Sequence, residues 1–330
     1  MKKIRLGWVG TAHDHSPQYL SCILKYPDVF EVIGLVEKRE EYLKTYYERF
    51  EVFKKIPLVT EEELIAMKPD AVMIEGFELD NVLDAIPYAK AGIHIHLDKP
   101  GGENMEDFKA LVEICREKKL VLNMGYMYRY NPAIQFCMEK IADGTVGDVI
   151  SVEAVMNTEH PDYKREWLSK FKAGNMFWLG CHMVDLIYRI QGKPKRVIPM
   201  NRRTGKGGIN SVDFGLCLFD YGNAVSIAQA SSSEVNGWGR RRLAVVGTKA
   251  TICVQPIESP TFVAITESKD TVGRNWATTE NKFEIKGHGR YDEFVLTFAK
   301  MVRGEMENPY TYDYELELQE LFLEACKIDD

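Results

Sequence analysis

Short apolar runs alternate with helical spacings through the first 123 residues. The apolar runs have the length of strands buried in a parallel sheet, and they are Ile4–Val9, Val32–Val36, Leu58–Val59, Ala71–Ile74, Ile93–Leu97 and Leu120–Asn123. Helical patterns fall between them, and the clearest is the i, i+3, i+4, i+7 spacing of Phe108, Leu111, Val112 and Cys115. A further helix is expected over 39–50. This alternation predicts an α/β domain with a doubly wound parallel sheet.

The pattern changes after Gly125. Helices are expected over 132–141 and 181–191, and two more close the chain. Strand-like stretches separated by turn signals dominate the rest, over 149–156, 212–219, 224–230, 243–246, 251–254 and 262–266. We therefore predict two domains, an α/β domain over 1–123 and an α+β domain over 124–330 with an open, mostly antiparallel sheet.

Composition narrows the range of partners and locations. The 330 residues carry a net charge of -7 and hold no long basic block, so we expect neither a nucleic-acid nor a membrane partner. There is no run of about 18 apolar residues that would span a bilayer. The seven cysteines are scattered without a C-x-x-C pair, which is typical of reduced core residues in a cytoplasmic protein.

The turn after the first strand resembles a degenerate dinucleotide-binding motif. Set against G-x-G-x-x-G, the segment 10–15 (GTAHDH) keeps only its first glycine. Gly10 suits the tight turn, and Ala12 is small enough to let the backbone approach a pyrophosphate at the next helix N-terminus. With the strand–helix order, this turn predicts a Rossmann domain whose NAD(P) site includes Gly10, Thr11, Ala12 and His13.

The end of the second strand bears on the choice of cofactor. Glu37 follows that strand, where a carboxylate can accept hydrogen bonds from the ribose hydroxyls and would repel a 2′-phosphate. Lys38 and Arg39 come next and could hold that phosphate instead, or they could simply form the charged start of a helix. We expect NAD, with NADP as the alternative, and place Glu37 and Lys38 in the cofactor site.

His13 and His15 lie two residues apart beside Asp14, a spacing that also suits metal ligands. No cluster of acidic or cysteine residues elsewhere in the sequence has ligand spacing. We therefore expect no metal and interpret the two histidines as lining the cofactor loop or the active site.

Two segments carry candidate catalytic residues. In the first, Asp98-Lys99-Pro100 ends a strand, so a lysine fixed by proline can point into the crevice and exchange a proton. The alternative for Lys99 is an ordinary surface lysine. In the second, His182 begins a helix, and imidazole suits proton transfer near neutral pH. The alternative for His182 is a satisfied core residue.

Taken together, these pieces resemble the glucose–fructose oxidoreductase / inositol dehydrogenase (Gfo/Idh/MocA) family. The resemblance covers nearly the whole chain and rests on the order and spacing of several motifs. They are the glycine turn, Ala91-Gly92, Asp98-Lys99-Pro100, the segment 125–132 (GYMYRYNP), the segment 180–185 (GCHMVD) and the acidic–aromatic stretch before Glu324.

The resemblance implies NAD or NADP, a sugar, sugar acid or polyol as substrate, and a homodimer or homotetramer formed through the C-terminal sheet. It assigns catalytic roles to Lys99 and His182. It places further cofactor contacts at Gly76, Phe77, Asp98 and Lys99, and substrate contacts at Tyr126, Arg129, Trp178 and Asp185.

Two positions depart from the family pattern. Trp178 stands in place of the aspartate of Asp-x-x-x-His, and Asn81 replaces a histidine in the turn after the fourth strand. We expect an NAD(P)-dependent oxidoreductase that acts on a CH–OH group, with a Lys/His proton relay. Two alternatives remain: a tightly held cofactor used for glycoside cleavage or epimerisation, and a catalytically silent ligand-binding member.

Overall fold

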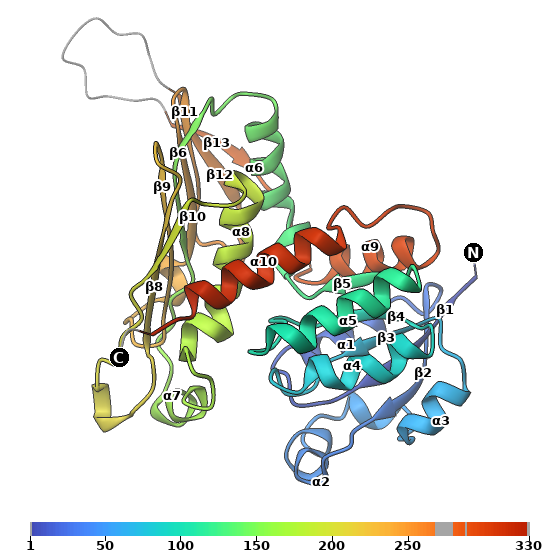
Figure 1. The fold of residues 1–330 in the computed structure, drawn as a ribbon. Coiled ribbons are helices and arrows are strands. Elements are labelled where there is room, and N and C mark those ends of the chain that lie inside the picture. Colours follow the sequence, from blue (N-terminus) through green and yellow to red (C-terminus); the bar gives the residue numbers. More distant parts are fainter. Residues whose placement is uncertain (1, 268–279, 288, 329–330) are drawn as a thin grey trace, which may run out of the picture. The chain divides into compact units, whose positions relative to one another are not determined.

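The computed structural model describes residues 2–267, 280–287 and 289–328. They divide into two compact units (Figure 1), Met1–Met127 with Gly289–Gln319, and Tyr128–His288 with Glu320–Asp330. The division falls close to the boundary expected at residue 123, but a segment from near the C-terminus belongs to the first unit. Among the described residues, no helix combines the length and the apolar character needed to cross a membrane.

Five parallel strands form the sheet of the first unit, in the order β2-β1-β3-β4-β5. They are β1 (Ile4–Val9), β2 (Phe30–Val36), β3 (Ala71–Ile74), β4 (His94–Leu97) and β5 (Leu122–Met124). This order confirms the predicted Rossmann-type sheet. The strand expected at 58–59 is reduced to one bridge between Leu35 and Leu58.

Helices accompany this sheet, and one of them from near the end of the chain explains the division into units. The helical segments are α1 (Ser16–Ile23), α2 (Glu40–Tyr42), η1 (Leu43–Tyr47), η2 (Phe53–Lys55), α3 (Glu61–Ala66), α4 (Asn81–Lys90), α5 (Met105–Glu117), α9 (Asp292–Val302) and α10 (Tyr312–Ala325), whose residues after Gln319 belong to the second unit. Helices α4 and α5 pack side by side, whereas α9 packs on α1. The rings of Phe294 and Phe298 on α9 lie 5.3 and 5.8 Å from the His96 ring on β4. Because α9 buries part of the first sheet, residues 289–319 belong with it.

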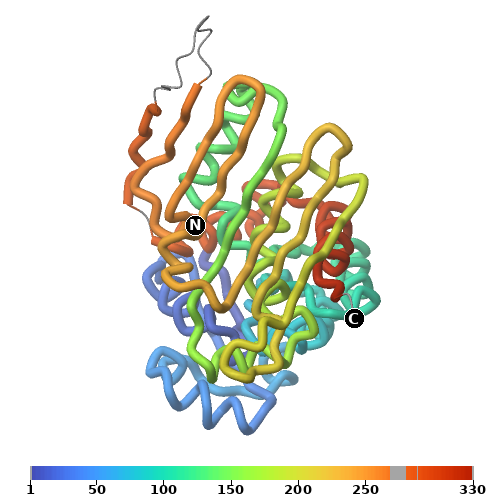
Figure 2. Tube along the Cα trace, turned by 90° about the vertical axis from the view of Figure 1, so that its left-hand side faces the viewer, coloured from blue at the N-terminus to red at the C-terminus, as the bar shows by residue number. Residues whose placement is uncertain are grey.

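The second unit contains an eight-stranded sheet in the order β13-β12-β11-β10-β6-β9-β8-β7. Every neighbouring pair is antiparallel except β6 with β9, which confirms the mostly antiparallel prediction. The strands run side by side in Figure 2. They are β6 (Val149–Val155), β7 (Arg196–Pro199), β8 (Phe214–Asp220), β9 (Val225–Ser231), β10 (Arg242–Gly247), β11 (Ala250–Val254), β12 (Phe262–Glu267) and β13 (Glu280–Glu284).

Helices of the second unit pack on one face of this sheet. The helical segments are η3 (Met127–Tyr130, at the unit boundary), α6 (Pro132–Ala142), α7 (Asp162–Leu168), η4 (Met176–Gly180), α8 (Cys181–Gln191), η5 (Lys206–Gly208) and η6 (Trp238–Arg240). Helix α8 contacts β6 and β9, and its residues from Cys181 to Tyr188 are all buried. A buried helix therefore carries the second group of candidate site residues.

Candidate active site

The turn between β1 and α1 brings two backbone segments into close contact. Gly10 has a φ of +85°, and its N–H donates to the Val36 carbonyl at 2.8 Å. A Cβ atom at Gly10 would lie only 2.3 Å from the Cα of Gly76, in the turn after β3. Only glycine fits this position, so the structure brings together two of the residues expected to hold a dinucleotide.

Glu37 closes the same turn from the end of β2. Its carboxylate accepts hydrogen bonds from the Thr11 N–H at 2.9 Å and the Thr11 hydroxyl at 2.7 Å, and from the Arg39 N–H at 3.2 Å. Burial raises the pKa of Glu37, although these donors oppose the shift. The neighbouring Ala12 is also buried. The predicted ribose carboxylate is thus fixed against the glycine turn.

The two basic residues after Glu37 are matched by carboxylates. Lys38 pairs with Glu61, and its Nζ lies 3.3 Å from an Asp84 oxygen. Arg39 lies 3.0 Å from carboxylate oxygens of both Asp80 and Asp84. Both cations therefore already have anionic partners within the first unit.

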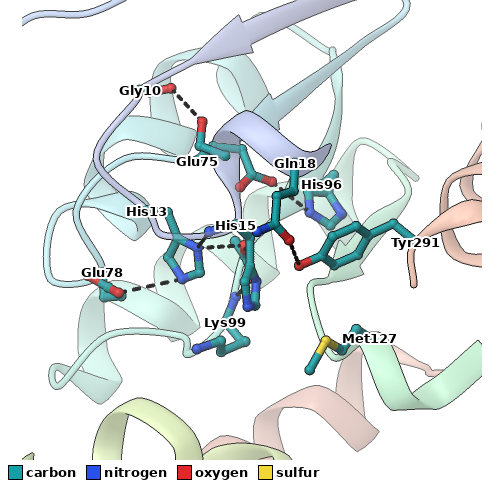
Figure 3. A network of polar contacts seen from close by, with 12 residues as sticks. Gly10, His13, His15, Gln18, Glu75, Glu78, His96, Lys99, Met127 and Tyr291 are labelled. Carbon is teal, nitrogen blue, oxygen red and sulfur yellow. Dashed lines mark hydrogen bonds and ion pairs between the residues drawn. The ribbon is translucent and has the colours of Figure 1, made fainter. Parts of the chain in front are cut away.

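A buried cluster of histidines and carboxylates lies where β1, β3 and β4 end. One carboxylate oxygen of Asp98 lies 2.9 Å from Nδ1 of His13 and 3.0 Å from Nδ1 of His15. On its other side, His13 places Nε2 3.5 Å from Glu78 (Figure 3). The fold thus joins the first turn to the strand end that precedes Lys99.

A second pair of buried polar residues lies behind this cluster. His96 Nε2 is 3.2 Å from a Glu75 oxygen (Figure 3). Nδ1 of His96 is 3.2 Å from the Asn123 amide nitrogen. Sequence reasoning missed Glu75, Glu78 and His96 as site residues. The sequence could have pointed to the two glutamates because they stand on either side of Gly76. Their burial, however, follows only from the packing of the turn.

The ionisation of this cluster follows from burial and pairing. Burial alone would raise the pKa of Asp98, but His13 and His15 hold it well below its usual value. Burial lowers the pKa of His15 to about 3, whereas Asp98 and Glu78 together outweigh burial and raise the pKa of His13. Burial, reinforced by Asp98, raises the pKa of Glu75 well above its usual value. The cluster therefore keeps an ionised Asp98 beside a neutral His15.

Lys99 is fully buried, unlike an ordinary surface lysine. Its backbone N–H donates to the second Asp98 oxygen at 2.7 Å, and a cis peptide bond joins it to Pro100. Figure 3 shows its side chain close to His13 and His15. Lys99 and Asp98 are thus held as one buried unit at the end of β4.

The second unit gathers other predicted residues around α8. His182 is buried, and its ring lies 5.3 Å from the ring of Tyr128. Trp178, one turn earlier on η4, lies 5.6 Å from the ring of Trp167, and the Lys164 ammonium lies 4.1 Å from the Trp178 ring centre. The position of the family aspartate is therefore filled by an aromatic cluster that includes a cation.

Two predicted substrate residues bind each other. Arg129 donates from Nε and Nη2 to one oxygen of Asp185, at 3.0 and 2.8 Å, and both side chains are almost fully buried. Tyr126 is also buried, and it belongs to the first unit. Phe77 is half-buried, with its ring 6.5 Å from that of Tyr42. The Arg129–Asp185 pair fixes α8 to the segment after β5, three residues from His182.

Comparison with known proteins identifies relatives of this chain. Residues 134–253 match the family model of the GFO/IDH/MocA C-terminal domain. The chain is 22% identical over 215 residues to scyllo-inositol 2-dehydrogenase (NADP(+)) IolW of Bacillus subtilis. The aligned segment covers 64% of this chain and 58% of that protein. It is 23% identical to myo-inositol 2-dehydrogenase of Thermotoga maritima, across 91% of this chain and 87% of that protein.

The fold has close structural neighbours. KijD10, a 3-ketoreductase from Actinomadura kijaniata solved in complex with NADP and TDP-benzene, superposes with a TM-score of 0.77 at 17% identity, covering 97% of this chain and 96% of that chain. By sequence, the chain spans only about half the length of several curated relatives that it matches, 58% for IolW and 47% for a D-xylose 1-dehydrogenase of Haloferax volcanii.

Proposed function

We propose that this chain is an NAD(P)-dependent oxidoreductase of the Gfo/Idh/MocA family, acting on the CH–OH group of a sugar, sugar acid or polyol. Two relatives are named inositol dehydrogenases, and a structural neighbour was solved with NADP. These names support a nicotinamide cofactor and a carbohydrate or polyol substrate for this chain as well.

The observation that carries the proposal is the contact of the turns after β1 and β3. Gly10 and Gly76 meet without side chains, so a pyrophosphate can approach the backbone of these turns closely. Thr11, Ala12 and His13 lie in the turn before α1, and Phe77 and Asp98 border the turns after β3 and β4. These residues would hold the dinucleotide.

Charge matching around β2 favours NAD over NADP. Glu37 is placed to accept hydrogen bonds from a ribose, and its negative charge would repel a 2′-phosphate. Lys38 and Arg39 could compensate a phosphate only by giving up Glu61, Asp80 and Asp84. We therefore propose NAD as the preferred cofactor.

The residues of the chain would bind the reactants and move one proton. When bound, the nicotinamide supplies hydride chemistry that no side chain can perform. Lys99, buried beside ionised Asp98, is proposed to exchange the hydroxyl proton or polarise its oxygen. His182 is proposed as a second proton-exchanging group, with Tyr126, Trp178 and the Arg129–Asp185 pair shaping the substrate site.

Hydride transfer tests this proposal directly. Purified protein is mixed with NAD and a panel of polyols, sugars and sugar acids, and NADH formation is followed by absorbance. Replacing Lys99 with Met or His182 with Asn should lower kcat about 100-fold or more, the range expected for a lost general acid–base group. Lys109→Met, on the exposed side of α5, serves as the matched control. Undiminished turnover in both site variants would overturn the assigned roles.

A further inference from the structure

We propose that His13, His15 and Asp98 form a binding site for one divalent transition-metal ion, with zinc as the best match. The site lies wholly within the first unit and draws its ligands from the turn after β1 and the end of β4. The inference goes beyond the proposed redox function and does not depend on it. It departs from the sequence-based expectation of no metal, because the sequence placed only two of the three ligands together.

Ligand geometry is the first argument. Each of the three residues offers one ligand atom, and these three atoms all lie within 4.8 Å of one another. The two Nδ1···Oδ2 distances, 2.9 and 3.0 Å, are close to the separation of about 3.3 Å between neighbouring ligands of a tetrahedral zinc ion at 2.0–2.1 Å. Small side-chain shifts would therefore open this triad around an ion.

The groups behind the ligands are the second argument. His13 turns its other nitrogen, Nε2, toward Glu78 at 3.5 Å. Asp98 turns its other oxygen toward the Lys99 N–H at 2.7 Å. Ligand histidines in metal sites typically donate their second N–H to a carboxylate, and ligand carboxylates are themselves hydrogen-bonded. With these outer contacts, His13 Nδ1 and Asp98 Oδ2 face each other at 2.9 Å, and Nδ1 also accepts a hydrogen bond from the His15 N–H at 3.2 Å, which an incoming ion would replace.

Charge is the third argument. The side chains of Glu75, Glu78 and Asp98 are fully buried within one cluster, and Lys99 is the buried lysine next to them. Buried carboxylates are costly unless they are paired or coordinate a cation. Asp98 is paired with His13 and His15, and a divalent ion bound between the three side chains would take over that pairing.

The backbone also makes room for this carboxylate. A Cβ atom at Gly125 would lie 2.3 Å from Oδ1 of Asp98. Glycine at this position therefore allows Asp98 to lie where both histidines reach it.

Three protein ligands leave a fourth tetrahedral position for water or a substrate oxygen, as in catalytic rather than structural zinc sites.

Metal binding by the whole chain tests the inference. The protein is stripped with a chelator, dialysed and titrated with Co²⁺, whose visible absorption reports four-coordinate binding, and then with Zn²⁺ in competition. We expect one equivalent to bind. His15→Ala and Asp98→Asn should weaken binding at least 100-fold, and Glu78→Gln, which changes only an outer contact, about 10- to 100-fold.

Asp14→Asn is the matched control, because Asp14 lies between the two histidines but is exposed and outside the triad. It should bind Co²⁺ as the unaltered chain does. Circular dichroism and NAD titration of each variant separate loss of the metal from loss of the fold or of cofactor binding. The inference is overturned if the folded, stripped chain binds no Co²⁺, or if His15→Ala and Asp98→Asn bind it as well as Asp14→Asn. In either case, retained NAD binding would leave the proposed function standing.

Discussion

At the scale of single residues, Glu37 combines burial with a role that needs its negative charge. Burial raises its pKa, so Glu37 takes up a proton at a higher pH than an exposed glutamate, whose pKa is about 4.3. Because the folded state binds that proton more tightly than the unfolded chain, this group stabilises the fold most at acid pH and loses that contribution as the pH rises through the raised pKa.

This linkage predicts a pH dependence of cofactor binding. Protonated Glu37 accepts ribose hydrogen bonds poorly, so NAD affinity should fall as the pH drops from 7 toward the raised pKa. In Glu37→Gln, affinity should be lower at pH 7 and nearly flat with pH. Fluorescence titration from pH 7.5 to about 5 measures both, with Glu31→Gln, exposed on the same strand, as the control. Parallel pH profiles for Glu37→Gln and the unaltered chain would contradict the role given to Glu37.

The buried Arg129–Asp185 pair predicts a large stability effect. Asp185→Asn removes the charge that compensates a fully buried guanidinium, which costs about 3–5 kcal/mol. Arg196→Gln breaks an ion pair whose arginine is exposed and should cost less than about 1 kcal/mol. Urea unfolding compares the two. Equal, small changes in the free energy of unfolding would show that the buried pair is not a structural tie.

The role of a site residue could be predicted from the sequence where that residue belongs to a local motif. Gly10 and Glu37 follow from the strand–turn–helix order, and their contacts agree with it. The partnership of Asp98 with His13 and His15 could not be read in this way. It joins positions some 83 to 85 apart in sequence, and only the alignment of parallel strand ends brings them together.

At the scale of elements, the turn after β1 can be tested with two glycines that share a backbone conformation. Gly10 and Gly92 have φ values of +85° and +82°, but a Cβ at Gly92 would meet no atom within 4 Å. Gly92→Ala should therefore cost only the strain of a left-handed residue, about 1–2 kcal/mol.

Gly10→Ala should cost several kcal/mol more in urea unfolding and abolish cofactor binding, because its Cβ would clash with the Gly76 backbone. If the two alanine variants unfold alike and Gly10→Ala still binds NAD, then the close approach of these turns is not what shapes the site.

Elements with a strong apolar pattern were predicted, and those without one were missed. Strands β1, β3 and β4 are apolar and buried, and all of them were found. Strand β13 is exposed at every position, and β7 is four residues long with no buried residue, so neither has a run of buried apolar residues to detect. The helix expected over 39–50 divides into α2 and η1, none of whose residues is buried.

At the scale of the whole molecule, the second sheet presents an apolar row on its helix-free face. Register places Ile198 beside Leu218, and Leu218 beside Ile227, on β7, β8 and β9. Ile198 is 38% exposed, and the other two are half-buried. An apolar row of this kind in a single chain favours association with a second copy.

We therefore predict a homodimer or homotetramer formed through this sheet. Leu218→Arg should shift the mass measured by light scattering after size-exclusion chromatography toward the monomer. Leu83→Arg, at an exposed leucine on α4, should leave the mass unchanged. An oligomer that tolerates Leu218→Arg, or a monomeric parent protein, would place the interface elsewhere or remove it.

The most direct test of the central claim is calorimetric titration of the purified chain with NAD and with NADP. A nicotinamide site built on Gly10, Gly76 and Glu37 predicts one NAD bound per chain, with NADP weaker. Glu37→Gln should weaken NAD about 10-fold or more, since a hydrogen bond to a charged group contributes about 1.5–3 kcal/mol. Failure of both dinucleotides to bind the folded chain would contradict the account.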